Sequence, residues 1–252
     1  LLLEKSSAIT AGGRNLGVRA EGEGNVRLDA SGDIELGVDV VSDRGDVSIL
    51  STGAIDALAG ADVATLGGTI DVQAIGGSLT FADEAFVQSG DGDIRLQAIG
   101  DLTLGGVDAG TGDVNLTATG AVLDGGDTLL DVAAAGLRIV AITGIGELGA
   151  TANALDVAVD TIAVITNTGG VSIAEADAIV IDAVDVLTRR VSFDATTIDL
   201  IDSPLSDLTV TGNAGIVLVT ADGSITLNEG DLDTTVVSTD GAAILLQAGG
   251  AE

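Results

Sequence analysis

The chain has no cysteine, histidine, methionine, tryptophan or tyrosine, and only three phenylalanines and one proline among its 252 residues. Without cysteine there is no disulfide scaffold, thiolate metal site or cysteine nucleophile. Without histidine, the commonest general base and zinc ligand is missing, and a Ser-His-Asp triad is excluded. The enzyme mechanisms and metal sites that depend on cysteine or histidine are therefore excluded.

Positive charge is almost as scarce. Nine basic and 39 acidic side chains give a formal net charge of -30, so nucleic acids and anionic membranes would be repelled as partners. The chain is nevertheless 46% hydrophobic, with a mean hydropathy of +0.52, which is too apolar for an acidic disordered tail. Its apolar runs are short and interrupted, so we expect no membrane-spanning segment.

The apolar residues that are present are small. Alanine, valine, isoleucine and leucine supply nearly all of them, and aromatic residues make up 1% of the chain. Such side chains can fill a thin core of uniform cross-section but not the irregular centre of an ordinary globular domain. The 37 glycines, together with β-branched residues, favour strands joined by tight turns over helices. We expect an elongated, repetitive all-β fold.

A short pattern recurs along the sequence: glycine, a small or acidic residue, then apolar and other residues in alternation, ending on a small residue. The clear copies are 24–30, 45–51, 68–74, 92–98 and 112–118, and the looser ones are 137–141, 171–174, 191–195 and 244–248. A second, weaker strand follows several copies, at 32–36, 77–81, 100–104, 197–200 and 223–227. The period of two predicts strands with one buried face.

The spacing of the copies predicts how these strands stack. The first apolar position falls at intervals of 20 to 24 residues, at Val26, Val47, Ile70, Ile94, Val114 and Leu137. This interval is typical of a single-stranded parallel β-helix, or β-solenoid, with coils of about 20–25 residues. We expect residues 1–252 to form one continuous solenoid, in which Pro204 lies in a turn. An antiparallel sandwich is the alternative, but its wider core needs larger side chains.

In this arrangement Ile94, Leu96 and Ala98 stack under Val114, Leu116 and Ala118 in the core. The residues between them, Arg95, Gln97, Asn115 and Thr117, are then expected to form exposed ladders. The candidates for the same column after Leu137 are Leu155, Val171, Val191, Ile216 and Ile244. The three phenylalanines, Phe81, Phe86 and Phe193, are expected in the core or at coil ends.

Residues 92–104 and 112–123 resemble the repeats of filamentous-haemagglutinin-like proteins, which are very long secreted bacterial surface proteins. Many of them are adhesins built on a right-handed parallel β-helix. The resemblance is clearest over residues 24–123, and the Asn-Pro-Asn motif that marks the family's secretion domain is not found in the chain. The resemblance implies that the chain is an interior segment of an extracellular shaft.

Calcium is the one cofactor for which the sequence offers hard oxygen ligands. The candidate pairs are Asp91 with Asp93, Asp124 with Asp127, and Asp231 with Asp233. The competing explanation is that aspartate is a favourable turn residue beside glycine, and its carboxylate is simply solvated. An acidic calcium- or mineral-binding surface protein remains an alternative function.

An enzyme is the rival class, because many β-helices cleave polysaccharides with paired aspartates or with calcium and a base. Asp182 and Asp185, close in sequence to Arg189 and Arg190, form the one local group of acids and bases. We favour a local surface ion pair, because the loops are expected to be short and no tryptophan or tyrosine is present to grip a sugar ring. We therefore expect no enzymatic activity and assign no catalytic residue.

The function that these observations favour is mechanical: a structural or adhesive shaft of a secreted, extracellular bacterial surface protein. The apolar pattern begins at Leu1–Leu3 and reaches Ile244–Ala248, and the chain has no initiator methionine. A solenoid needs polar caps, so we expect the terminal coils to meet neighbouring segments or other copies of the chain end to end. Receptors would be bound through regions outside this sequence, without nucleic acid or membrane insertion.

Overall fold

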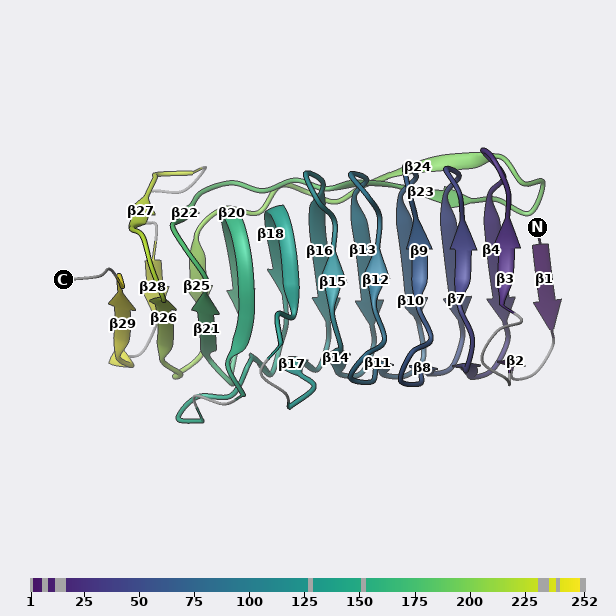
Figure 1. Ribbon diagram of the computed structural model, residues 1–252. Helices are drawn as coiled ribbons and strands as arrows, with labels where there is room; N and C mark the ends of the chain where they lie inside the picture. Colours follow the sequence, from purple (N-terminus) through teal and green to yellow (C-terminus); the bar gives the residue numbers. More distant parts are fainter. Residues whose placement is uncertain are drawn as a thin grey trace.

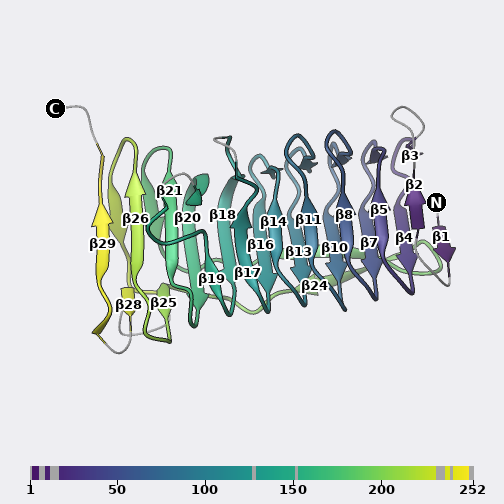
Figure 2. The same cartoon turned by 90° about the horizontal axis from the view of Figure 1, so that it is seen from below.

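The strands stack side by side as a parallel β-solenoid, which confirms the predicted fold class. The computed structural model describes residues 2–5, 9–11, 17–126, 129–150, 153–230, 236–238 and 241–249. Figures 1 and 2 show the coils following one another along a single axis, with the two ends of the chain at opposite ends of the stack. No helix among the described residues is long and apolar enough to cross a membrane.

Each coil contributes up to three short strands, which form three stacks. The first stack contains β1 (Leu2–Lys5), β4 (Val26–Ala30), β7 (Val47–Ser51), β10 (Ile70–Ala74), β13 (Ile94–Ala98) and β16 (Asp113–Ala118). The second contains β2 (Ile9–Ala11), β5 (Ile34–Leu36), β8 (Ile55–Ala57), β11 (Leu79–Phe81), β14 (Leu102–Leu104), β17 (Ala121–Asp124) and β19 (Gly144–Ile145). The third contains β3 (Val18–Ala20), β6 (Val40–Ser42), β9 (Val63–Thr65), β12 (Val87–Gln88) and β15 (Val107–Asp108).

Further along, longer strands replace this regular pattern. The strand β18 (Val132–Val140) pairs with both β15 and β16, so it joins the third stack to the first, and β20 (Leu155–Thr166) continues alongside it. The remaining solenoid strands are β21 (Val171–Glu175), β22 (Ile179–Ile181), β25 (Leu208–Val210), β26 (Ile216–Thr220), β27 (Ile225–Leu227), β28 (Val236–Ser238) and β29 (Ile244–Gln247). All of these pairings are parallel.

The register of the first stack agrees with the predicted spacing. Partners along one column are Val26, Val47, Ile70, Ile94, Val114 and Leu137, each opposite the next. Paired residues lie 20 to 25 positions apart in sequence, which confirms the predicted coil length.

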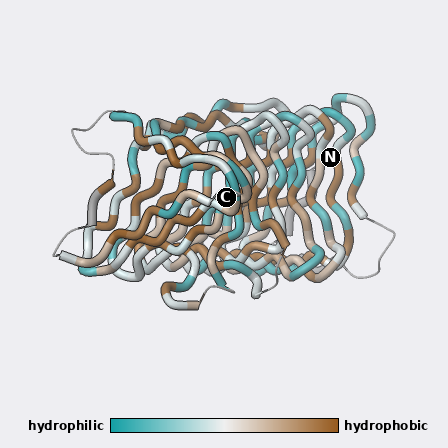
Figure 3. The backbone as a smooth tube through the Cα atoms, turned by 60° about the vertical axis from the view of Figure 1, so that its left-hand side comes forward, coloured by the Kyte–Doolittle hydropathy of each residue, from teal (hydrophilic) through white to brown (hydrophobic). Residues whose placement is uncertain are grey.

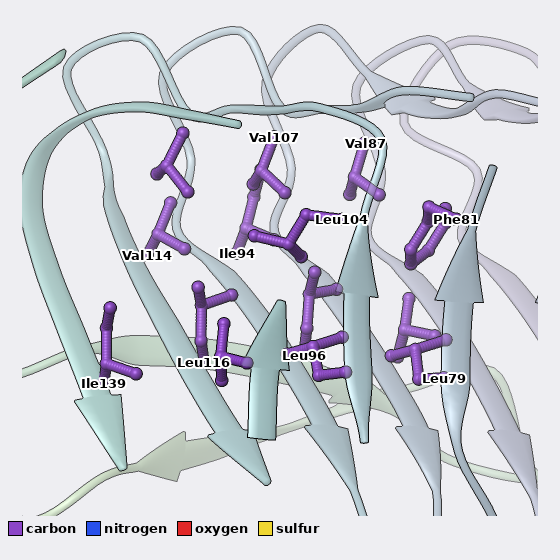
Figure 4. Packing of buried hydrophobic residues seen from close by; sticks show 14 of the residues in the cluster. Leu79, Phe81, Val87, Ile94, Leu96, Leu104, Val107, Val114, Leu116 and Ile139 are labelled. Atoms are coloured by element: carbon purple, nitrogen blue, oxygen red, sulfur yellow. The ribbon is translucent and has the colours of Figure 1, made fainter. Parts of the chain in front are cut away.

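The core is a continuous column of aliphatic side chains. Ile94, Leu96, Val114 and Leu116 have no exposed surface, as predicted. Figure 4 shows these residues on neighbouring strands of the first stack, together with Phe81 and Leu104 of the second stack. Figure 3 shows hydrophobic and hydrophilic positions alternating along the coils, which is the period-two pattern seen in the sequence.

The recurring glycine of the repeat is required by the close approach of the next coil. A Cβ atom on Gly92 would lie 2.0 Å from the carbonyl oxygen of Gly68, and one on Gly68 would lie 2.1 Å from that of Gly45. Any larger residue at these positions would push neighbouring coils apart.

None of the predicted positions after Leu137 continues its column. Leu137 pairs with Ile162, so Leu155 does not continue its column. Val171, Ile216 and Ile244 do stack on one another, but Val171 pairs with Ile145 of the second stack. The long strand β20 contains no glycine, so the glycine-led pattern of the repeat is lost at this point.

The remaining predicted position, Val191, does not belong to the solenoid at all. Residues 182–207, called the arm here, leave the coil after β22 and return at β25. The arm contains β23 (Leu187–Val191) and β24 (Thr197–Ile201), which pair with each other in antiparallel fashion. Figure 1 shows the arm running back along the solenoid toward its N-terminal end. The predictions of short loops and of coil strands at 191–195 and 197–200 are therefore wrong.

The arm is an insertion into one otherwise continuous coil. The strand β22 ends at Ile181 opposite Ile162, and β25 begins at Leu208 opposite Val164. Ala163 lies between these positions and packs in a small apolar cluster with Val184, Val186 and Leu205 at the base of the arm. The solenoid pairing therefore resumes as soon as the arm ends.

Candidate functional site

The arm lies on a row of polar residues that point outward from the first stack. This row, the polar column, contains Arg27, Ser48, Asp71, Arg95, Asn115 and Arg138, each paired with the next across neighbouring coils. Asn115 is completely buried, and Gln97 and Thr117 beside the column are half-buried. The prediction that Arg95, Gln97, Asn115 and Thr117 form exposed ladders is therefore wrong, because the arm covers this face.

Near its tip, the arm is held by Arg27, Ser48 and Asp71. Arg27 donates to the carbonyl oxygen of Val191, and its guanidinium carbon lies 4.2 Å from the centre of the Phe193 ring. The hydroxyl of Ser48 accepts the Val191 N–H at 2.9 Å. Phe193 lies on the arm and is 61% exposed, so its predicted place in the core or at a coil end is wrong. Phe81 is buried as expected, and Phe86 is half-buried.

Further along, Asp71 and Asp202 are the acidic centres of the interface. Asp71 has no exposed surface and binds Arg95 at 3.1 Å and Arg190 at 2.7 Å. Asp202, on the arm, binds Arg95 at 3.2 Å and accepts from the Asn115 side chain at 2.7 Å. Because each carboxylate meets a guanidinium, the desolvation of these charges is offset by ion pairing.

A second row of polar residues, just before the first-stack strands, also binds the arm. Asn25 donates to the Ala195 carbonyl at 3.1 Å, and Asp46 binds Arg189 at 3.0 Å. Thr69 accepts the Arg189 N–H at 2.7 Å, and Asp93 accepts the Leu187 N–H at 3.0 Å. Side chains on successive coils thus hold the arm, three of them through its backbone and Asp46 through the Arg189 side chain.

At the base of the arm, acidic groups gather around a cavity of about 240 Å³. Asp113, Asp160 and Asp185 line it. Burial raises the pKa of Asp113 above its ordinary value, and the charges of Asp93 and Asp185 raise it further. Burial of the Arg138 guanidinium lowers its pKa, and the nearby negative charge of Asp202 opposes this effect. This end of the interface holds a surplus of negative charge.

A larger groove of about 590 Å³ lies beside the arm tip. It is lined by Arg44 and Arg189 together with Glu23, Asn25 and Asp46. The groove is polar and of mixed charge, and one of its two arginines is already paired with Asp46. It therefore offers no strongly cationic surface to an acidic ligand.

Glu175 is a buried acid whose pKa is strongly raised. Its side chain is 1% exposed and accepts backbone N–H groups of Val159 and Asp177, both at 3.2 Å. Burial raises its pKa to about 7, and the backbone hydrogen bonds only partly offset this effect. It borders a cavity of about 300 Å³ that also includes Leu129 and Leu130.

The aspartates predicted as calcium ligands have individual structural contacts where they are described. Asp91 accepts from the Thr111 hydroxyl at 2.9 Å, Asp93 accepts backbone N–H groups of Asp113 and Leu187, and Asp124 accepts the Gly126 N–H at 2.8 Å. Asp127, Asp231 and Asp233 lie outside the described residues. Within the described ranges, no three acidic side chains are arranged to hold a metal ion.

The predicted local pairing of Asp182 and Asp185 with the two arginines is not what the structure shows. Arg189 and Arg190 pair with Asp46 and Asp71, which lie on distant coils. Asp182 accepts instead from the Asn228 side chain and the Ala183 N–H, and these bonds lower its pKa. The arginine pair therefore fastens the arm to the solenoid.

Sequence reasoning also missed what many aspartates do. Asp33, Asp101 and Asp131 each accept a backbone N–H from the following coil, at 2.8, 2.8 and 2.7 Å. Asp46 and Asp62 make the same kind of bond, with the N–H groups of Thr69 and Phe86. These carboxylates are thus connectors between coils as well as turn residues.

Two signals in the sequence could have revealed the arm. Residues 171–211 contain no glycine, although glycine punctuates the rest of the chain, and they include its sole proline and its sole pair of adjacent basic residues. Comparison with known proteins adds no identity, since no family model, no curated protein and no solved structure matches the chain.

Proposed function

We propose that this chain is a stiff structural or adhesive segment of an extracellular, secreted bacterial surface protein. The observation that supports it is the arm bound across successive coils of one continuous core. Hydrogen bonds between parallel strands run from coil to coil, aspartate carboxylates add further links, and the arm spans the coils from Arg27 to Arg138. Such bracing resists separation of the coils.

The resemblance of residues 92–104 and 112–123 to filamentous-haemagglutinin-like repeats supports the same proposal. In a shaft of that kind, terminal coils continue into neighbouring segments or meet other copies end to end. Receptor binding then belongs to other parts of the protein. Antibody labelling of intact and permeabilised cells that express the protein tests the extracellular location: labelling confined to permeabilised cells would contradict it.

Single-molecule pulling tests the mechanical role. The chain is held at its two ends between reference domains and stretched along the solenoid axis. We expect discrete force peaks. Each peak would mark the opening of one coil, which releases about 75 Å of chain. Smooth extension without peaks, as in a flexible linker, would contradict a load-bearing role.

Polysaccharide cleavage is the competing function, and the same protein can be assayed for it. We expect no turnover of acidic polysaccharides. Turnover that disappears in Asp182→Asn or Asp185→Asn would show that the protein is an enzyme and would contradict the proposed shaft.

A further inference from the structure

The arm contacts the solenoid through β23, which is one edge of its two-stranded ribbon. Asp202 donates its N–H to the Val186 carbonyl at 3.1 Å, and Ser192 donates to the Thr196 carbonyl at 2.7 Å. Even-numbered residues of β23 are therefore the ones that hydrogen-bond to β24. Odd-numbered residues of β23 turn their backbone groups the other way, where Asp93, Thr69 and Ser48 accept their N–H groups.

The same alternation leaves the outer edge of β24 open. Thr197, Asp199 and Ile201 direct their backbone N–H and C=O groups away from β23, and within the described part of the chain these groups have no partner. Figure 1 shows β24 on the far side of β23 from the solenoid. By contrast, every described solenoid strand from β7 to β22 has a paired strand on each side.

Apart from the charge of Asp199, the side chains of β24 do not protect this edge. Edge strands usually carry lysine, proline or a bulge that prevents pairing with another chain. The strand β24 has none of these, and Ile198 and Ile201 are 51% and 70% exposed. Solenoid side chains hold β23 from below, so the open edge is fixed in position before any partner arrives.

The charge of the arm limits which strands can pair with the outer edge of β24. Asp199 and Asp194 are exposed on the arm, while the guanidinium groups of Arg189 and Arg190 are engaged by Asp46 and Asp71. A second copy of the chain would bring another net charge of -30 to the same place. A cationic strand would instead be attracted.

We propose that β24 is a docking strand, to which an extended cationic segment of a partner protein adds as the third strand of the arm. In this arrangement a lysine or arginine of the partner lies opposite Asp199. Apolar residues lie opposite Ile198 and Leu200, whose side chains point to the other face of the ribbon. This docking strand goes beyond the proposed shaft and does not depend on it.

The test measures binding of a fluorescein-labelled peptide of alternating valine and lysine, with blocked ends, at about 150 mM salt. Its matched controls are the same peptide with glutamate in place of lysine, and a version N-methylated along one edge. The protein variants are Asp199→Pro, which removes an outward N–H without touching the β23–β24 ladder, and Asp199→Asn, which removes only the charge.

We expect saturable binding to the lysine peptide, weakened about tenfold or more by N-methylation and by Asp199→Pro, and less by Asp199→Asn. The glutamate peptide should not bind. Absence of binding up to about 1 mM, or equal binding of the N-methylated peptide to the unaltered protein, would overturn the proposal. Self-association that Asp199→Pro abolishes would also overturn it, because the edge would then accept a second copy.

Discussion

Glu175 is the residue through which pH acts on the interior of the solenoid. Its carboxyl group has a pKa of about 7 in the folded chain, against an ordinary value of 4.5. Between these two pH values the folded state keeps a proton that the unfolded state has lost. Its contribution to stability is therefore present below pH 4.5 and is lost as the pH rises to 7.

We predict that Glu175→Gln stabilises the protein at pH 8, by up to about 3 kcal/mol, and has little effect at pH 4. Urea unfolding of the variant and the unaltered protein at both pH values measures the difference. The control is Glu35→Gln, at an exposed position of β5, which should change stability little at either pH. Equal stability of Glu175→Gln and the unaltered protein at pH 8 would contradict this account.

Gly92 tests the close approach of successive coils. Its missing Cβ would lie 2.0 Å from the Gly68 carbonyl oxygen, so Gly92→Ala should lower the free energy of unfolding by about 1–3 kcal/mol. Gly67→Ala is the matched control, because the nearest atom to its added Cβ, on Arg44, is 4.0 Å away. Similar urea midpoints for the two variants would show that the coils have room to separate.

At the scale of elements, the sequence predicts the regular coils well. The column from Val26 to Leu137 follows from glycine-led alternation, because each coil repeats the same local pattern and register follows from it. The arm could not be predicted in the same way. Residues 191–195 satisfy the strand pattern of the repeat, yet ion pairs and hydrogen bonds with distant coils place them outside the stack.

The candidate sites were predicted less well for a related reason. An aspartate beside glycine is compatible with a turn, a metal ligand or a bond to the next coil, and only the stacking of coils distinguishes these. Asp93 illustrates this, since its two carboxylate oxygens bind the backbone of Asp113 on the next coil and of Leu187 on the arm.

The arm should be dispensable for folding of the solenoid. Deleting residues 182–206 leaves Asp207 opposite Ala163, so that the strand can continue from Ile181 to Leu208 in the existing register. We predict that the shortened chain keeps its β-structure by circular dichroism but melts at a lower temperature, because the polar column loses its partners. A shortened chain without β-structure would show that the arm is part of the folding unit.

At the scale of the whole molecule, negative charge opposes the compact state. With a net charge of -30 and carboxylates recurring on successive coils, added salt should reduce repulsion. We predict that about 1 M sodium chloride, or millimolar calcium, raises the melting temperature by a few degrees relative to dilute buffer. A melting temperature that is unchanged or lowered in both would mean that the arm ion pairs dominate the electrostatics.

The central claim is that one solenoid carries a docked arm whose outer edge is open. Residue-resolved amide hydrogen exchange of the whole chain tests it most directly. The account predicts slow exchange in the internal coils and at Leu187, Arg189, Val191, Ile198 and Leu200, with fast exchange at Thr197, Asp199 and Ile201. Fast exchange throughout residues 187–201 beside protected coils, or protection of those three outward amides in the monomer, would contradict it.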